Sequence, residues 1–470
     1  MQELNQRGLM QLDLTEVPGL DNLHNPCACL RESQNLAASV FKAQETFYLV
    51  NGSTVGLEAA ILAINSPQGK AIIPRHAHVS VLNALILSGG NPIVAPVLME
   101  KTWGIPLGVS PETLSALIEK EITLSEEERL LGKVLGKEGE AAGKKALDFV
   151  LTVNPTYQGV GYTAGAIKKL VQEKGIPHVV DEAHGAHLFF QESCPLSLQK
   201  EQADIVVQST HKTLAAFTQA SMLHVNTPRY RAPIREALQI LQTTSPSYLL
   251  LASLDSVQAQ MQERGAELVE KKRELADLLR KEMRGILGLK VFPEGGLPRG
   301  WHYDPAKVLV SAADLGLTGW ELAELLRVKQ GIIVEMADYF SVLFLVTWGH
   351  DYEDIGKVGR ALREIVRTKK GKGKPLPALN YPADLYERTI RLLLTPREVY
   401  YNKKEAVSIE AASGRISGKA LTVYPPGIPC VWPGQVLEPA QIEYLQWALD
   451  HKLAVQGVSE DNQIAVIKES

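Results

Sequence analysis

Cysteine is scarce in this chain of 470 residues, which contains only Cys27, Cys29, Cys194 and Cys430. Four thiols at these spacings exclude a small disulfide-stapled scaffold and favour a reducing compartment, the cytoplasm. His24 lies close to Cys27 and Cys29, but a zinc site requires about four ligands and no second pair follows. We therefore expect no metal centre.

Long hydrophobic runs are also missing, since no segment approaches the roughly 20 apolar residues that cross a bilayer. The opening MQELNQRGLMQLDL has neither the basic nor the apolar region of a signal peptide. Neither sign of charge is in excess, because 49 Lys+Arg face 53 Asp+Glu, a net charge of −4. Such a balance creates no field that gathers nucleic acid or anionic lipid. The sequence predicts a soluble protein that binds neither nucleic acid nor a membrane.

Short β-branched runs alternate with helical patterns from about residue 45, which is typical of βαβ units and a mostly parallel sheet. The predicted strands are residues 71–74, 148–153, 178–181 and 204–208. Each is followed by a loop rich in Gly, Ser, His or Pro, at the strand end where open α/β sheets bind ligands. Predicted helices at 57–64 and 164–175 lie between these strands. The main body is predicted to be an α/β domain.

A second α/β pattern follows a long amphipathic stretch at about 247–286. Its predicted strands are 307–312, 331–336 and 342–347, and its predicted helices are 319–329 and 353–368. Residues 367–378 are basic and rich in Gly and Pro, which indicates a linker to a C-terminal module. Residues 122–146 are polar and charged, and we interpret them as a helical surface insertion.

The chain is thus divided into four predicted parts. They are an N-terminal segment (1–40), a large α/β domain (41–250), a small α/β domain (251–370) and a C-terminal domain (371–470).

The strongest chemical signal is QSTHKTL (208–214), which places Lys212 just after a predicted strand. A lysine amine can condense with an aldehyde there, while neighbouring hydroxyl, imidazole and N–H groups take a phosphate. Asp181 in DEAHGAH (181–187) ends an earlier strand, where its carboxylate can pair with a pyridinium nitrogen and keep the ring an electron sink. An aspartate at a strand end is by itself more simply a turn or cap residue. With Lys212 at this spacing, the pair predicts a pyridoxal 5'-phosphate (PLP) site.

Two further segments suit the same cofactor. VNGSTVGLEAAI (50–61) runs from a Gly/Ser/Thr loop into a helix, whose free N–H groups and positive end attract a phosphate. Small residues before a helix are otherwise a simple cap, and neither the P-loop nor the dinucleotide-binding spacing is present. PRHAHVSV (74–81) carries His78, whose flat imidazole could stack on a pyridine ring or lie on the surface.

These motifs, together with NPTYQGV (154–160), TTSPSY (243–248) and YPPGIP (424–429), resemble the Orn/Lys/Arg decarboxylases of PLP fold type I, in particular compact bacterial arginine decarboxylases. The resemblance extends from about residue 12 to the C-terminus. It implies a PLP-binding, PLP-dependent transferase-like large domain with a mostly parallel sheet, a smaller α/β domain and a decarboxylase-family C-terminal domain. It also implies a homodimer or an oligomer of dimers.

Carried over motif by motif, the resemblance implies three catalytic residues. Lys212 holds the cofactor aldehyde, Asp181 pairs with the ring nitrogen and His78 stacks on the ring. The other cofactor-binding residues it implies are Ser53, Thr54, Ser209 and His211 around the phosphate, His184 against the cofactor, and Thr243 reaching the phosphate of the neighbouring subunit.

The reaction that the resemblance implies is decarboxylation of a basic amino acid, arginine first and then lysine or ornithine, to CO₂ and the corresponding polyamine-pathway amine. An aminotransferase of the same fold is the first alternative. Aminotransferases usually grip the substrate carboxylate with an arginine of the small domain, and Arg360, Arg363 and Arg367 have the spacing of a solvated helix face instead.

A cofactor-binding paralogue without turnover is the second alternative, because the chain departs from the family pattern. The family's additional N-terminal segment with a PGHK-like motif precedes the point where this chain begins. Val79 stands where lysine is common, and Gln435 replaces the glutamate of a PGE motif. Loss of that charge would weaken a contact with a guanidinium or ammonium group, so we expect a high KM for the basic substrate.

Overall fold

The computed structural model describes residues 8–134, 145–369, 374–376, 383–424 and 427–469. A seven-stranded sheet at its centre has the strand order β1-β10-β9-β8-β6-β2-β3. The strands from β9 to β3 run parallel, whereas β10 is antiparallel to β9 and β1 is antiparallel to β10. Their bounds are β1 Glu45–Leu49, β2 Lys70–Pro74, β3 Asn91–Ala95, β6 Phe149–Val153, β8 His178–Asp181, β9 Ile205–Gln208 and β10 Ser221–Val225. The predicted α/β fold with a mostly parallel sheet is confirmed.

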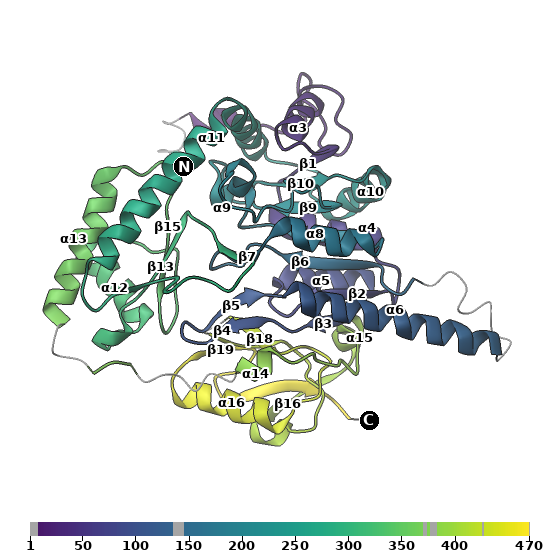
Figure 1. The fold of residues 1–470 in the computed structure, drawn as a ribbon. Helices are drawn as coiled ribbons and strands as arrows, with labels where there is room; N and C mark the ends of the chain where they lie inside the picture. Colours follow the sequence, from purple (N-terminus) through teal and green to yellow (C-terminus); the bar gives the residue numbers. More distant parts are fainter. Residues whose placement is uncertain (1–7, 135–144, 370–373, 377–382, 425–426, 470) are drawn as a thin grey trace.

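Helices cover both faces of this sheet, which is why its parallel strands are nearly continuous apolar runs (Figure 1). Alternate residues of β6 face opposite sides: Phe149 and Leu151 pack with α4 (Gly52–Ile64), α5 (Val79–Ser88) and α10 (Arg231–Leu241). Val150 packs instead with α6 (Pro111–Val134) and α8 (Ala164–Glu173). The start of the predicted insertion at 122–146 is therefore the continuation of α6, while residues 135–144 lie outside the described part.

The small domain is built on a four-stranded antiparallel sheet in the order β11-β13-β15-β14. Its elements are β11 Lys290–Val291, β13 Lys307–Ser311, β14 Met336–Ala337, β15 Val342–Leu345, α12 Gly319–Gln330 and α13 Tyr352–Lys369. The long helix α11 (Tyr248–Arg284) joins it to the large domain, because Leu251 and Leu254 pack with Tyr48 and Met222 of the large sheet and Leu275 and Leu279 pack in the small core.

Most of the strand predicted at 331–336 is not formed, since only Met336 and Ala337 pair, with β15. The reason is the end of α12 at Gly331, which adopts φ 61° and donates to the carbonyl of Arg327. Ile332 turns into the small core while Ile333 is exposed. The apolar residues that predicted a strand, Ile332 and Ile333, therefore belong to the turn that follows the helix.

The C-terminal domain lies beneath the large domain in the view of Figure 1. It contains α14 Ala383–Tyr386, α15 Pro396–Tyr401, β16 Lys404–Ser408, β17 Leu421–Tyr424, β18 Ile428–Val431, α16 Pro439–Asp450, β19 Ala454–Gln456 and β20 Gln463–Ile467. The fully buried Arg75 at the end of β2 ties it to the large domain, donating to the carbonyls of Pro429 at 3.1 Å, Cys430 at 2.5 Å and Leu385.

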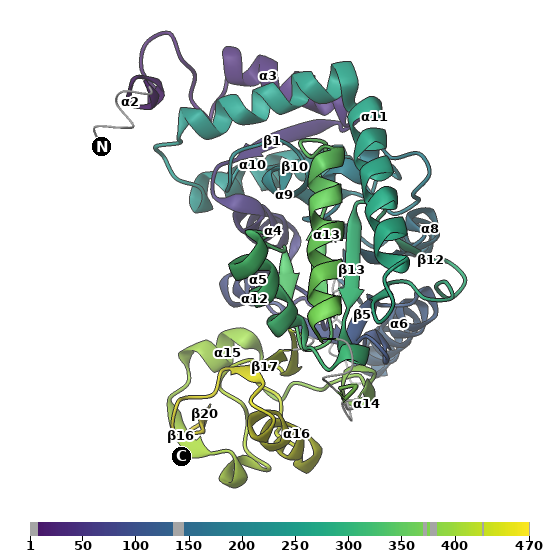
Figure 2. The same cartoon turned by 90° about the vertical axis from the view of Figure 1, so that its left-hand side faces the viewer.

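The remaining elements are short or peripheral. They are α2 Leu9–Leu12, α3 Cys29–Val40, β4 Leu98–Glu100, β5 Ile105–Gly108, β7 Val160–Tyr162, α9 Thr210–Thr213 and β12 Trp301–Tyr303, with 3₁₀ turns at Ala186–Phe190, Pro228–Tyr230, Ala313–Leu315 and Glu410–Ala412. Figure 2 shows α2 standing away from the body of the chain. Within the described ranges, every helix is too short or too polar to span a membrane. The domain limits stay predictions.

Candidate active site

Lys212 lies in the single turn α9, which follows the end of β9. Its backbone N–H donates to the carbonyl of Ser209, so the chain turns immediately after the strand and brings the side chain to the sheet edge. The Lys212 Nζ is 3.2 Å from the Nε2 of His184. Burial lowers the pKa of the ammonium, and the negative charges of Asp181 and Glu335 oppose that shift. A lysine with a lowered pKa supplies more free amine, the form that condenses with an aldehyde.

Asp181 is the last residue of β8, the strand that pairs with β9. Its carboxylate is buried, and its Oδ1 accepts a hydrogen bond from the N–H of Ala183 at 3.1 Å. Burial raises the pKa of the carboxyl group, whereas the Ala183 N–H and the charges of His78 and Lys212 lower it. A buried carboxylate that favours nearby positive charge suits the protonated nitrogen of a pyridine ring.

His184 lies three residues after Asp181 and is buried against Lys212. Its ring packs edge-on against Tyr157, with the ring centroids 4.6 Å apart. Burial holds the pKa of His184 well below its ordinary value, and the positive charges of Lys307 and Lys212 add to that effect. The imidazole is therefore neutral, and in one of its two tautomers the Nε2 accepts a hydrogen bond from the Lys212 amine.

His78 caps the start of α5, and both the N–H and the hydroxyl of Ser80 contact its Nδ1, at 3.2 and 2.9 Å. Because Nδ1 accepts the N–H, the ring carries its proton on Nε2. The side chain is exposed overall. The neighbouring protein still desolvates the ring enough to lower its pKa, which Asp181 raises and Lys212 lowers. His78 thus interacts electrostatically with both principal site residues.

Three of the residues predicted to bind the cofactor phosphate lie together at the start of α4. The hydroxyl of Ser209 donates to the hydroxyl of Ser53 at 2.8 Å, which joins the loop before Lys212 to the first turn of the helix. Thr54 lies beside Ser53 in that turn and is half-buried. Gly52 adopts φ 77°, a conformation that glycine tolerates best. The free N–H groups of a helix start and two adjacent hydroxyls form a suitable anion site.

His211 and Thr243 lie at the margin of this group. The Nδ1 of His211 is 2.9 Å from the carbonyl of Ala220 and must be its donor, which leaves Nε2 as the acceptor nitrogen. Thr243 is held by its backbone, since its N–H donates to Asn51 at 3.2 Å and its carbonyl lies 2.9 Å from His24 Nε2. Asn51 directly precedes Gly52, the first residue of α4.

Two further residues, Tyr157 and Glu335, interact with His184 and Lys212 and were not predicted from the sequence. Tyr157 lies in the motif NPTYQGV, which was used for the resemblance but given no role, and its ring covers His184. Its hydroxyl donates to Glu335 at 3.1 Å, across from the large domain to the small one. Glu335 is exposed, and its negative charge acts on Lys212. The only sequence signal for Glu335 was a carboxylate within an otherwise apolar run.

The residues present fit PLP. An amine with a lowered pKa suits the aldehyde, a buried carboxylate suits the ring nitrogen, and hydroxyl groups at a helix start suit the phosphate.

Comparison with solved structures places the fold in a known class. The lysine decarboxylase of Francisella novicida superposes with a TM-score of 0.80, covering 95% of this chain and 73% of that one at 19% identity. The ureidoglycine–glyoxylate aminotransferase of Bacillus subtilis superposes with a TM-score of 0.55 at 17% identity, covering 76% of this chain and 89% of that one. The chain therefore has the fold of PLP fold type I enzymes, as predicted.

Sequence comparison is more specific. The Orn/Lys/Arg decarboxylase major domain matches residues 5–294, and the C-terminal domain of the same family matches residues 381–467. The arginine decarboxylase of Bacillus subtilis is 32% identical over 466 residues, which cover 98% of this chain and 90% of that protein. The lysine decarboxylase of Pseudomonas aeruginosa is 26% identical and covers 95% of this chain and 70% of that protein. This chain belongs to the Orn/Lys/Arg decarboxylase family, and the predicted enzyme class, an amino-acid decarboxylase, is confirmed.

Proposed function

We propose that this protein is a PLP-dependent decarboxylase of a basic amino acid, with arginine as the first candidate and lysine or ornithine next. The observation that carries the proposal is the contact of the Lys212 amine with a neutral His184 next to the buried Asp181. When bound, PLP supplies an electron sink that stabilises the carbanion left when CO₂ departs.

The chain's own residues have separable roles in this proposal. Lys212 binds the aldehyde, Asp181 keeps the ring nitrogen protonated, and Ser53 with Ser209 binds the phosphate. The side chains of Lys212 and His184, whose Nζ and Nε2 atoms lie 3.2 Å apart, can hold the proton that Cα requires after CO₂ has left. His78, at the exposed edge of the group, would stack on the ring of the bound cofactor.

The preference for a basic substrate is supported by an acidic group at the site. Glu335 lies on the small-domain side and acts electrostatically on Lys212, so its carboxylate can attract a guanidinium or ammonium group. Gln435 is buried in the C-terminal domain, and its Oε1 accepts the N–H of Trp432 at 3.1 Å. Its side chain therefore stabilises a local turn, and its effect on substrate affinity stays a prediction.

Family membership favours decarboxylation over transamination, the first alternative. The proposal extends to a cytoplasmic homodimer or an oligomer of dimers, in which Thr243 of one subunit approaches the phosphate of the other.

Purified protein loaded with PLP and mixed separately with arginine, lysine and ornithine tests the proposal. We expect CO₂ and the matching amine in equal amounts from at least one of them, fastest with arginine. Asp181→Asn should retain PLP but lose about 100-fold or more in kcat, because the amide cannot hold the ring nitrogen protonated. Formation of the oxo acid without CO₂ would establish an aminotransferase, and no product from any of the three would indicate the non-catalytic paralogue.

A further inference from the structure

A buried cluster of charged side chains lies behind the catalytic loops. It consists of Lys272 from α11, Asp304 just before β13, Lys307 at the start of β13, and His187 three residues after His184. All four are at most 1% exposed. The Nε2 of His187 lies 3.0 Å from Asp304 Oδ1, which also accepts the N–H of Ala306 at 2.8 Å.

Each lysine of the cluster binds a backbone carbonyl next to a site residue. The Nζ of Lys272 lies 3.4 Å from the carbonyl of Thr213, the residue that follows Lys212. The Nζ of Lys307 donates to the carbonyl of Tyr157 and lies 5.5 Å from the centre of its ring, and that ring packs on His184. The two ammonium groups therefore bind the loop that carries Lys212 and the loop that carries Tyr157, whose ring packs on His184.

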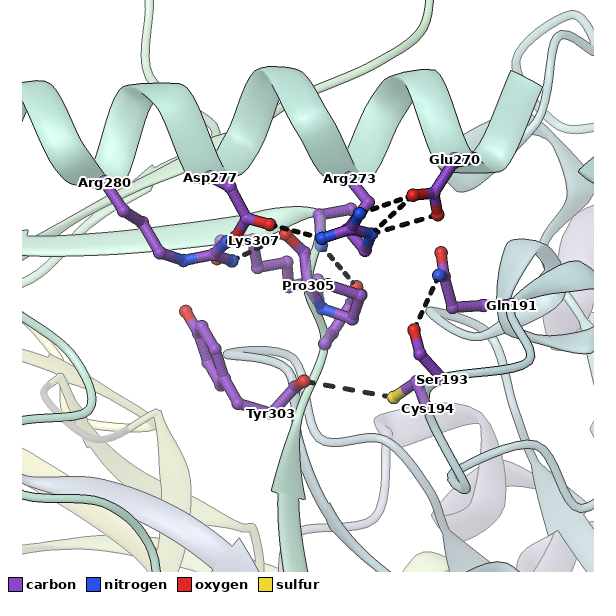
Figure 3. Close-up of polar contacts among 12 residues, drawn as sticks. Gln191, Ser193, Cys194, Glu270, Arg273, Asp277, Arg280, Tyr303, Pro305 and Lys307 are labelled. Carbon is purple, nitrogen blue, oxygen red and sulfur yellow. Dashed lines mark hydrogen bonds and ion pairs between the residues drawn. The ribbon is translucent and has the colours of Figure 1, made fainter. Parts of the chain in front are cut away.

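The cluster is itself fixed rigidly. Figure 3 shows Arg280 reaching from α11 to the backbone beside Lys307, where it donates to the carbonyls of Lys307 at 2.7 Å and Pro305 at 2.6 Å. On the other side, the N–H of Asp304 donates to the carbonyl of Gly159, two residues after Tyr157, at 2.7 Å. A small-domain turn is thus bound both to α11 and to a loop of the large domain.

The cluster contains buried charges of both signs. Burial lowers the pKa of Lys272 and of Lys307 to about 8, so both carry a proton at neutral pH. Burial alone would raise the pKa of Asp304, but His187 and the two lysines hold it well below its usual range. Two buried ammonium groups thus lie near the one buried carboxylate of Asp304, and the exposed Glu335 adds a second negative charge that acts on Lys307.

We propose that Lys272 and Lys307 are positioning residues for the Lys212–His184 pair, acting through the carbonyls of Thr213 and Tyr157. The inference rests on the proposed function for the roles of Lys212 and His184. The positive charge of Lys307 also helps to keep His184 neutral, so that its Nε2 remains an acceptor for the Lys212 amine.

Lys272→Met and Lys307→Met test this role against Lys271→Met as the matched control. Lys271 is the neighbouring lysine of α11, is exposed, and also donates to a backbone carbonyl, that of Trp348 at 2.9 Å. We expect either buried variant to lower kcat by about tenfold or more with little change in KM, because misplaced catalytic groups slow the chemical step. Because removing one partner of a buried charged cluster lowers stability, kcat is compared well below the Tm of each variant, where all of the protein is folded. The control should retain kcat.

A second readout needs no cofactor. Reductive methylation of the PLP-free protein, followed by peptide mass spectrometry, gives the pH at which Lys212 becomes reactive. The charged and titratable groups around it are His78, Asp181, His184, His211, Lys307 and Glu335. Lys307→Met removes a positive charge, so the midpoint for Lys212 should move to higher pH, and Lys271→Met should leave it in place.

Retained kcat in both buried variants, a loss of activity that only follows a loss of Tm, or an unmoved Lys212 midpoint in Lys307→Met would each overturn the inference. If the unmodified protein releases CO₂ from none of the three amino acids, the proposed function fails instead. The methylation measurement still decides the positioning role in that case.

Discussion

Glu335 is the residue that we link most directly to substrate choice. It contacts Tyr157 through a hydrogen bond of 3.1 Å, and its charge is felt at Lys212. Glu335→Gln keeps the acceptor for the tyrosine but removes the charge that attracts a basic substrate.

We expect Glu335→Gln to raise the KM for arginine about tenfold or more, since a charge-assisted hydrogen bond contributes about 1.5 to 3 kcal/mol. Steady-state kinetics provide the measurement, with Glu324→Gln on the exposed face of α12 as the control. An unchanged KM for arginine, lysine and ornithine alike would remove Glu335 from substrate recognition.

The site residues that belong to short sequence motifs were predicted from the sequence. Those that lie in no motif, and that only the fold brings to the site, were not predicted. QSTHKTL and DEAHGAH place Lys212 and Asp181 at the ends of neighbouring parallel strands, so strand-end chemistry alone predicted where they lie. Lys272 and Lys307 come from a helix and a strand far along the chain. A lysine within an amphipathic helix or at a strand start is most simply a surface residue, and only the packing of α11 against β13 buries them.

At the scale of the element, the loop between β6 and β7 depends on its glycine. Gly159 adopts φ 101°, and a Cβ there would lie 2.8 Å from Lys307 Cδ and 3.1 Å from Asp304 Cβ. Both backbone strain and collision with the buried cluster therefore oppose a side chain at this position.

Gly159→Ala should lower the free energy of unfolding by about 1 to 3 kcal/mol and reduce kcat, because the loop carries Tyr157. Gly175→Ala is the matched control, since Gly175 has φ 65° but nothing within 4 Å of the added Cβ. Urea denaturation of both variants separates collision from strain. Equal losses of stability in the two would show that the contact with Lys307 adds nothing.

Element prediction succeeded for βαβ units and failed where a capping turn used apolar residues. The parallel strands were marked by apolar runs with polar loops behind them, whereas residues 331–336 form mainly the Gly331 turn after α12. The pairing of β1 with β10 was not predicted either, because it joins segments about 175 residues apart.

At the scale of the whole molecule, buried neutral histidines make stability depend on pH. His178 on β8 is 3% exposed, and burial lowers its pKa to about 4, with Lys168 adding to and Asp204 opposing the shift. The unfolded chain binds a proton at this residue near pH 6.5, and the folded chain does so only near pH 4. Its contribution is therefore fully present above about pH 6.5 and is lost as the pH falls toward 4.

His178→Gln should flatten the pH dependence of stability. Below about pH 6.5, the unmodified protein should lose up to about 1.4 kcal/mol per pH unit more than the variant. Urea denaturation between about pH 5 and pH 7 measures the difference, with the exposed His451→Gln as the control. Parallel curves for the unmodified protein and His178→Gln would contradict a neutral buried imidazole.

At the edge of the seven-stranded sheet, we propose that Lys212 is the lysine that holds the cofactor aldehyde. The most direct measurement is borohydride reduction of the PLP-loaded protein, followed by peptide mass spectrometry. We expect one modified lysine per chain, Lys212, and no modification in Lys212→Ala. A label on Lys272, Lys307 or any other lysine, with Lys212 unmodified, would contradict the proposal.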